Sequence, residues 1–192
     1  MSHGHHAEHG GGEGHGNKKI AIFIAVLAAL LAIAEAGGKS AQTAALFHNI
    51  DATNLWQFFQ AKTIRRTALQ VGRSVLEYTG AEGLPANIAE GRRKQVEQWR
   101  EDIRRYESEP ETQEGRQELM KRAKAQEELR DRSMAAYHLY ELSSASFQIA
   151  IVLASATIIT GAAWLIYVGG ALSAIGIVLS AVAWLAPIAI HL

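Results

Sequence analysis

The residues best suited to chemistry in this chain are histidines near its N-terminus. Five of the eight histidines lie within the first 17 residues: His3, His5, His6, His9 and His15. Neutral imidazoles bind Zn, Cu and Ni, and several in one short segment raise the local ligand concentration without fixing a geometry. Glycine is also dense here, and its backbone entropy opposes folding. Residues 1–17 are therefore predicted to be a disordered, solvated tail. Its histidines either have only incidental metal affinity or bind Zn, Cu or Ni as a function.

Two further histidines are each followed, three positions later, by an acidic residue. His48 precedes Asp51 in this way, and His138 precedes Glu141. At this spacing two side chains lie on one face of a helix. Two imidazoles and two carboxylates could hold a divalent metal if the pairs face each other beside the membrane. Ordinary hydrogen-bonded pairs near helix ends are the alternative interpretation.

An acidic residue follows the first apolar segment of the chain. Residues 20–34 are uninterrupted apolar side chains, and Glu35 comes directly after them. Lys39 lies four positions further on, so the two side chains can form an ion pair on one helix face and reach the lipid headgroups. Because ionisable groups in membrane segments are frequently functional, a proton or ion relay at Glu35 is the alternative.

Signatures of the common enzyme classes are missing from the sequence. It contains no cysteine, no phosphate-binding loop, no nucleophile elbow and no zinc-protease H-E-x-x-H motif, and it has no segment typical of a β-strand. We therefore expect no catalytic residue, no cofactor-binding residue and no enzymatic activity. The 19 basic and 19 acidic residues balance, which gives no reason to expect nucleic acid as a partner.

The charged residues are confined almost entirely to the middle of the chain. All but five lie between Lys39 and Glu141, and residues 142–192 contain no Asp, Glu, Lys or Arg. A soluble domain is normally about one quarter charged, so this uncharged end is predicted to lie in lipid. A membrane helix needs roughly 20 residues, and three segments suffice: 18–39, 143 to about 162, and 169–190. A cleaved signal peptide is the alternative for the first segment, although its end lacks a small-residue cleavage site.

Residues 40–142 are predicted to form a charged extramembrane insert of helices. Apolar residues recur at helical intervals over 41–78, a break with Gly80 and Pro85 follows, and further helices run to about 108 and from about 112 towards 142. Their narrow apolar seams favour a helical hairpin or coiled coil over a thick core. The predicted fold class is all-α: an integral membrane protein with three transmembrane helices and a helical hairpin or coiled-coil insert. Its predicted parts are a tail (1–17), a first transmembrane helix (18–39), the insert (40–142) and a two-helix transmembrane hairpin (143–192).

The last predicted membrane helix carries a row of small residues. Spaced alternately four and three apart, they are Gly169, Ser173, Gly176, Ser180 and Ala183. In lipid, such residues allow another helix backbone to approach closely. The row is predicted to be a helix-packing seam, either within the chain or between copies of it.

Several blocks of the sequence occur together in a recognisable order. They are a His- and Gly-rich tail, KKIAIFIAVLAALLAIAEAGGKSAQTAAL (18–46), NLWQFFQAKTIRRT (54–67), RYESEPETQEGRQEL (105–119) and AAYHLYELSSASFQIAIVLASATIITG (135–161). In these blocks the chain resembles an uncharacterised bacterial family of small multi-pass membrane proteins, a domain of unknown function. The resemblance implies an inner-membrane protein with a helical insert. It implies no activity and no site residue.

The function expected from these features is that of a membrane scaffold or accessory subunit that self-associates or joins a larger complex. Its expected partners are the lipid bilayer and copies of itself or other membrane subunits. The expected location is the bacterial inner membrane, with a cytoplasmic N-terminus because Lys18 and Lys19 precede the first span. The alternative is a channel or transporter component, or a metal-handling membrane protein that uses the histidine-rich tail.

Overall fold

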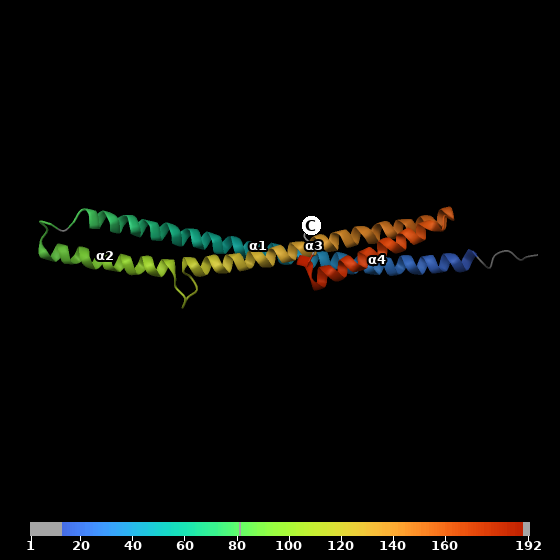
Figure 1. Ribbon diagram of the computed structural model, residues 1–192, viewed down its shortest axis with the longest axis horizontal. Helices are drawn as coiled ribbons and strands as arrows, with labels where there is room; N and C mark the ends of the chain where they lie inside the picture. The colour runs from blue at the N-terminus through green and yellow to red at the C-terminus, as the bar shows by residue number, and fades with distance from the viewer. Residues whose placement is uncertain (1–12, 81, 190–192) are drawn as a thin grey trace, which may run out of the picture. The chain divides into compact units, whose positions relative to one another are not determined.

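The computed structural model describes residues 13–80 and 82–189, and every regular element in them is helical. Figure 1 shows α1 (Glu13–Tyr78), α2 (Ala86–Glu107), α3 (Arg116–Thr160), α4 (Trp164–Leu185) and the short 3₁₀ helix η1 (Pro187–Ala189). The prediction of an all-α chain is confirmed for these residues. Three of the helices, α1, α3 and α4, are long and apolar enough to cross a membrane. The described chain thus contains the three apolar helices that the charge pattern predicts.

Both long helices run without interruption through the predicted boundaries at residues 39 and 142. The hydroxyl groups near these boundaries do not cap new helices, because Thr43 donates to the Lys39 carbonyl and Ser146 to the Leu142 carbonyl, each at 2.8 Å. Such bonds to the carbonyl four residues back leave the helix intact. Since helix hydrogen bonds are local, a change from apolar to charged residues does not end a helix.

The predicted break between α1 and α2 is present. Helix α1 ends at Tyr78 and α2 begins after Pro85, while Gly80 adopts φ 62°, a left-handed conformation that glycine tolerates. The next break is longer than predicted. Residues 108–115, which we call the α2–α3 loop, precede α3, and Gln113 in this loop has φ 59°.

The final helix begins earlier and ends earlier than predicted. Helix α4 starts at Trp164, so Trp164 and Tyr167 lie in the helix and not in the connection before it. The connection is only residues 161–163, in which Gly161 turns the chain with φ 68°. At the other end Pro187 cannot donate a backbone hydrogen bond, which explains why α4 stops at Leu185 instead of continuing to residue 190.

The chain divides into two compact units. Unit 1 consists of residues up to 45 and from 131 onward, and unit 2 consists of Leu46–Arg130. In unit 1 the first part of α1, the second part of α3 and α4 pack around a small apolar core formed by Leu27, Ala34, Phe147 and Ala150. Alanine at two of these four positions lets the helices approach closely.

In unit 2 the second part of α1 packs against two other helices along its length. Helix α2 and then the first part of α3 lie antiparallel against the second part of α1 (Figure 1). Few apolar side chains are buried in this unit: Ala52, Ile103, Leu119 and Ala123. Polar contacts between the helices therefore contribute a large share of what fixes their register.

Candidate functional site

The small-residue row on α4 lies against α3 of the same chain. Gly169, Ser173, Gly176 and Ala183 are buried. A Cβ added to Gly176 would lie 2.9 Å from the Phe147 ring, and one added to Gly169 would lie 3.2 Å from the Ala150 carbonyl oxygen. These contacts explain why glycine occupies both positions.

Polar groups join the same two helices. The Ser143 hydroxyl, fully buried, lies 2.7 Å from the Gly176 carbonyl oxygen and 2.7 Å from the Ser180 hydroxyl. A hydroxyl has one proton, so Ser143 donates to Gly176 and accepts from Ser180. In the described structure the seam therefore joins helices within one chain.

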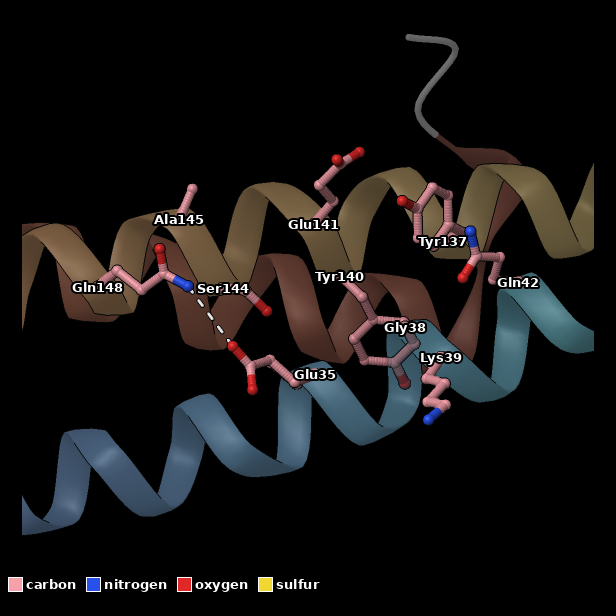
Figure 2. Close-up of a pocket in the computed structure, with 11 residues that line it drawn as sticks. Glu35, Gly38, Lys39, Gln42, Tyr137, Tyr140, Glu141, Ser144, Ala145 and Gln148 are labelled. Atoms are coloured by element: carbon pink, nitrogen blue, oxygen red, sulfur yellow. Dashed lines mark hydrogen bonds between the residues drawn. The ribbon is translucent and has the colours of Figure 1, made fainter.

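A cleft of about 440 Å³ lies between α1 and α3 in unit 1, as Figure 2 shows. Its lining includes the carboxylates of Glu35 and Glu141, the amide of Gln148 and the ring of Tyr140. The Tyr140 ring packs on Gly37, where an added Cβ would lie 2.8 Å from it. Glycine at this position thus admits the ring between the helices and shapes the cleft.

The ion pair between Glu35 and Lys39 stays a prediction, and the structure gives the Glu35 carboxylate another partner. The Glu35 carboxylate instead accepts a hydrogen bond of 3.5 Å from the Gln148 amide on α3 (Figure 2). An exposed pair four residues apart contributes only about 0.2–0.5 kcal/mol, so a contact across the helix interface readily competes with it. The sequence contains no local signal for this partner, because residue 148 is far away along the chain.

The predicted metal ligands do not gather in the described part of the chain. No group of three or more histidine, aspartate and glutamate side chains there could hold a metal ion. In unit 2, His48 Nδ1 lies 2.8 Å from Gln126 Oε1, and Asp51 borders a cleft with Arg122. In unit 1, His138 Nδ1 lies 3.6 Å from Glu141. The metal site of His48, Asp51, His138 and Glu141 stays a prediction without a ligand cluster in this structure.

The tail histidines fall outside the part of the structure that can be described. His3, His5, His6 and His9 precede residue 13, and His15 belongs to the first turn of α1 without a described side chain. Metal binding by these five residues therefore stays a prediction.

Unit 2 contains a buried lysine, Lys62, that the sequence pattern did not single out as a site residue. It joins α1 to the α2–α3 loop. The Lys62 side chain is 8% exposed and lies 3.7 Å from both Glu109 and Glu114 of the α2–α3 loop. Its ammonium also lies 5.4 Å from the centre of the Phe58 ring and 5.3 Å from that of Tyr106. Leucines at 55, 69 and 76 are seven or fourteen residues from Lys62, so the heptad spacing was the signal that this lysine faces inward.

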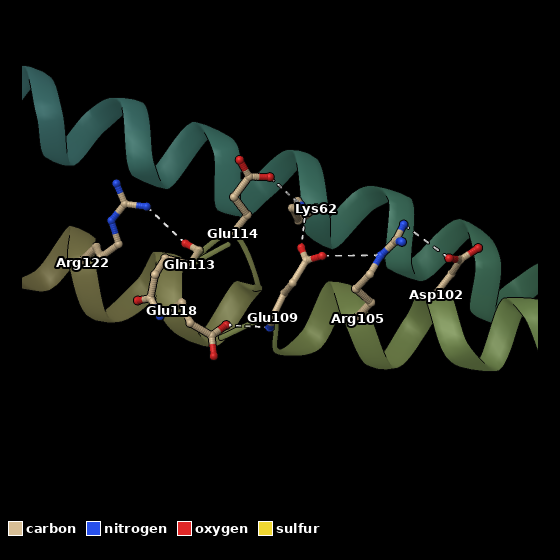
Figure 3. Close-up of polar contacts among 8 residues, drawn as sticks. All are labelled: Lys62, Asp102, Arg105, Glu109, Gln113, Glu114, Glu118 and Arg122. Atoms are coloured by element: carbon tan, nitrogen blue, oxygen red, sulfur yellow. Dashed lines mark hydrogen bonds and ion pairs between the residues drawn. The ribbon is translucent and has the colours of Figure 1, made fainter. Parts of the chain in front are cut away.

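Further polar contacts close the α2–α3 loop, as Figure 3 shows. The Glu118 carboxylate accepts a hydrogen bond of 2.7 Å from the Ser108 hydroxyl and one of 3.1 Å from the Glu109 backbone N–H. The bond from Ser108 holds the pKa of the Glu118 carboxyl below its usual range. Glu118 thus stays ionised at neutral pH and accepts both bonds.

The aromatic residues of unit 2 take part in internal packing. Trp56 donates a hydrogen bond of 2.8 Å to Glu127, and its ring meets Phe59 edge to face with centroids 5.4 Å apart. The guanidinium of Arg116 lies 4.8 Å from the Phe59 ring centre. Trp56 and Phe59 therefore contribute to packing within unit 2.

Comparison with known proteins places the chain in a family. No curated protein and no solved structure matches the chain. The family model described as "Domain of unknown function (DUF4337)" matches residues 16–186, which include α2, α3, α4 and nearly all of α1. The chain therefore belongs to the DUF4337 family, a domain of unknown function.

Proposed function

We propose that this protein is a non-enzymatic membrane scaffold or accessory subunit that associates with copies of itself or joins a larger membrane complex. The observation that carries the proposal is a surface of α1 in unit 2, which we call the α1 stripe. Its ten positions are Phe47, Ile50, Asn54, Gln57, Ala61, Ile64, Ala68, Val71, Val75 and Tyr78. The six large apolar side chains among them are between 46% and 94% exposed. An exposed, uncharged and largely apolar surface of this kind in a charged segment is typical of an interaction site.

Membrane insertion of unit 1 is supported by where its apolar side chains lie. Phe147 and Leu27 are buried between helices, yet many equally apolar residues face outward and are more than half exposed: Ile22, Val26, Ile33, Ile149, Val152, Ile159, Ile175 and Val178. Apolar groups on both the inside and the outside of a bundle suit a lipid solvent. The resemblance of the sequence to a bacterial family, and Lys18 and Lys19 before the first span, support a bacterial inner membrane with a cytoplasmic N-terminus.

The native mass of the full chain in a mild detergent tests the proposal. We expect particles that contain at least two copies of the chain, or one copy with other membrane proteins, because the α1 stripe would otherwise be left in water. Chemical cross-linking before extraction controls for dissociation by the detergent. A strict monomer, both in detergent that preserves other complexes and after cross-linking in membranes, would contradict the proposal.

A channel or transporter component is the second candidate, and the ionisable side chains in the cleft of unit 1 favour it. Glu35 immediately follows an apolar run and shares the cleft with Glu141, Gln148 and Lys39, so two carboxylates and an amide able to bind a cation lie there beside one lysine. Deletion of residues 3–15 combined with a Glu35→Gln variant separates the two classes. Loss of metal tolerance or of cation flux into vesicles supports the transporter, whereas unchanged flux and tolerance support the scaffold.

A further inference from the structure

The α1 stripe has the spacing of a coiled-coil seam. Its ten residues are alternately three and four positions apart, from Phe47 to Tyr78, which gives the 3.5-residue period of two supercoiled helices. All of them are exposed except Ala61, which is half-buried. The contacts of α1 with α2, α3 and the α2–α3 loop come from a different set of positions, such as Trp56, Lys62 and Glu77. Helix α1 therefore has a second face that no other part of unit 2 covers.

The absence of charge on this face favours a second copy of the same face as its partner. None of its ten positions is charged, although α1 in unit 2 carries charges at Asp51, Lys62 and Arg65 nearby. Two copies of the stripe can therefore meet without repulsion between like charges. In a parallel arrangement the flanking Arg65 would lie beside Gln60 of the second copy, which is an uncharged residue.

The two polar residues within the stripe, Asn54 and Gln57, can form hydrogen bonds with the same residues of a second copy. With Phe47 and Ile50 as the first and fourth positions of a heptad, Asn54 takes the first position of the next heptad. An asparagine at this position commonly fixes the register of a parallel two-stranded coiled coil. An amide both donates and accepts, so two Asn54 side chains facing each other satisfy one another, and so do two Gln57 side chains. A purely apolar partner would leave these amides unpaired, at a cost of about 1–3 kcal/mol each.

Membrane anchoring would impose the required orientation. Two copies that insert the same N-terminal segment into one bilayer have α1 running in the same direction. The same residue then lies at the same height in both copies, which is the condition for a parallel, in-register seam. Tethering in one membrane also raises the effective concentration of each stripe for the other.

We propose that the α1 stripe is the surface through which two copies of this chain associate, parallel and in register. This inference rests on the proposed function, because it identifies the partner of a self-associating membrane subunit. It assigns no role in association to the small-residue seam of α4, since α3 of the same chain already occupies that seam.

Disulfide cross-linking of single-cysteine variants tests the inference, because the natural chain has no cysteine. The variants Val71→Cys and Val75→Cys place a thiol in the stripe. Lys94→Cys is the matched control, since its side chain is 73% exposed on α2, away from the stripe. In native membranes with a mild oxidant, we expect the two stripe variants to form disulfide-linked homodimers at least tenfold faster than the control.

Two results would overturn the inference. One is equal cross-linking of Val71→Cys and Lys94→Cys, and the other is capture of a different protein by the stripe variants in place of a second copy. The native mass of the unsubstituted chain, measured in parallel, separates this failure from failure of the proposed function. A multimeric mass without stripe cross-links rejects only the α1 stripe, whereas a strict monomer without cross-links rejects both proposals.

Discussion

Replacement of Gly176 by leucine is expected to lower the free energy of unfolding of unit 1 by about 1–3 kcal/mol, the usual cost of overpacking a well-packed interface. A Cβ at this position already lies 2.9 Å from the Phe147 ring, and the leucine side chain extends further into α3. The Gly176 carbonyl also accepts the hydrogen bond from Ser143, so separation of the helices breaks a buried polar contact as well. Thermal unfolding in detergent, followed by loss of the monodisperse peak, measures the effect.

The chain offers a matched control six residues away on the same helix. A Cβ added to Gly170 would meet no atom within 4 Å. Gly170→Leu therefore gains the same helix propensity and the same apolar side chain without the collision. We expect its apparent Tm to stay at or above that of the natural chain. Equal destabilisation of the Gly170→Leu and Gly176→Leu variants would show that α4 does not pack on α3 through this seam.

Replacement of Lys62 by methionine is expected to loosen the α2–α3 loop. Methionine keeps an unbranched apolar side chain between Phe58 and Tyr106, but it removes the cation that Glu109 and Glu114 share. Glu114 then loses its Lys62 partner, and Glu109 keeps only Arg105, 3.8 Å away. Breaking a fully buried ion pair costs about 3–5 kcal/mol. Because Glu109 is 21% exposed and Glu114 49% exposed, water compensates in part, and we expect about 1–3 kcal/mol here.

Hydrogen exchange of the loop amides measures this change. If the free energy needed to open the loop falls by about 1–3 kcal/mol, its amides exchange about five- to 150-fold faster. The Gln113 amide donates a hydrogen bond of 3.0 Å to the Glu109 carbonyl and is a suitable reporter. Lys94→Met is the control, because Lys94 pairs with Glu90 at a highly exposed site and such pairs contribute little. If both variants leave Gln113 exchange unchanged, Lys62 does not hold the loop.

Several features of this fold were predictable because they depend on residues close together in the chain. Gly80 and Pro85 mark the end of one helix and the start of the next, since their backbone preferences act locally. The break before α3 was harder to predict. It depends on Glu118 and Lys62, which bind the loop from outside it, and acidic residues near 112 resemble an ordinary helix start.

In the candidate sites too, features that depend on neighbouring residues were predictable, whereas partners from distant parts of the chain were not. The spacing of Gly169 and Gly176 indicated a packing seam, but it did not distinguish a helix of the same chain from a second copy. Phe147 and Ser143 decide that question, and they lie on another helix. The spacing of Glu35 and Lys39 predicted an ion pair from one helix alone, whereas the structure pairs Glu35 with Gln148.

The amino-acid sequence by itself determined that the described chain is helical, which of its helices are apolar enough for lipid, and which residues are small enough for close packing. Periodicity, charge and side-chain volume are properties of neighbouring residues, so they can be read along the chain. Only the tertiary structure decided that α3 covers the α4 seam, that Lys62 is buried against a loop, and that the α1 stripe stays uncovered. These outcomes depend on the register between helices separated by tens of residues, and that register is set by the sum of many contacts of similar strength.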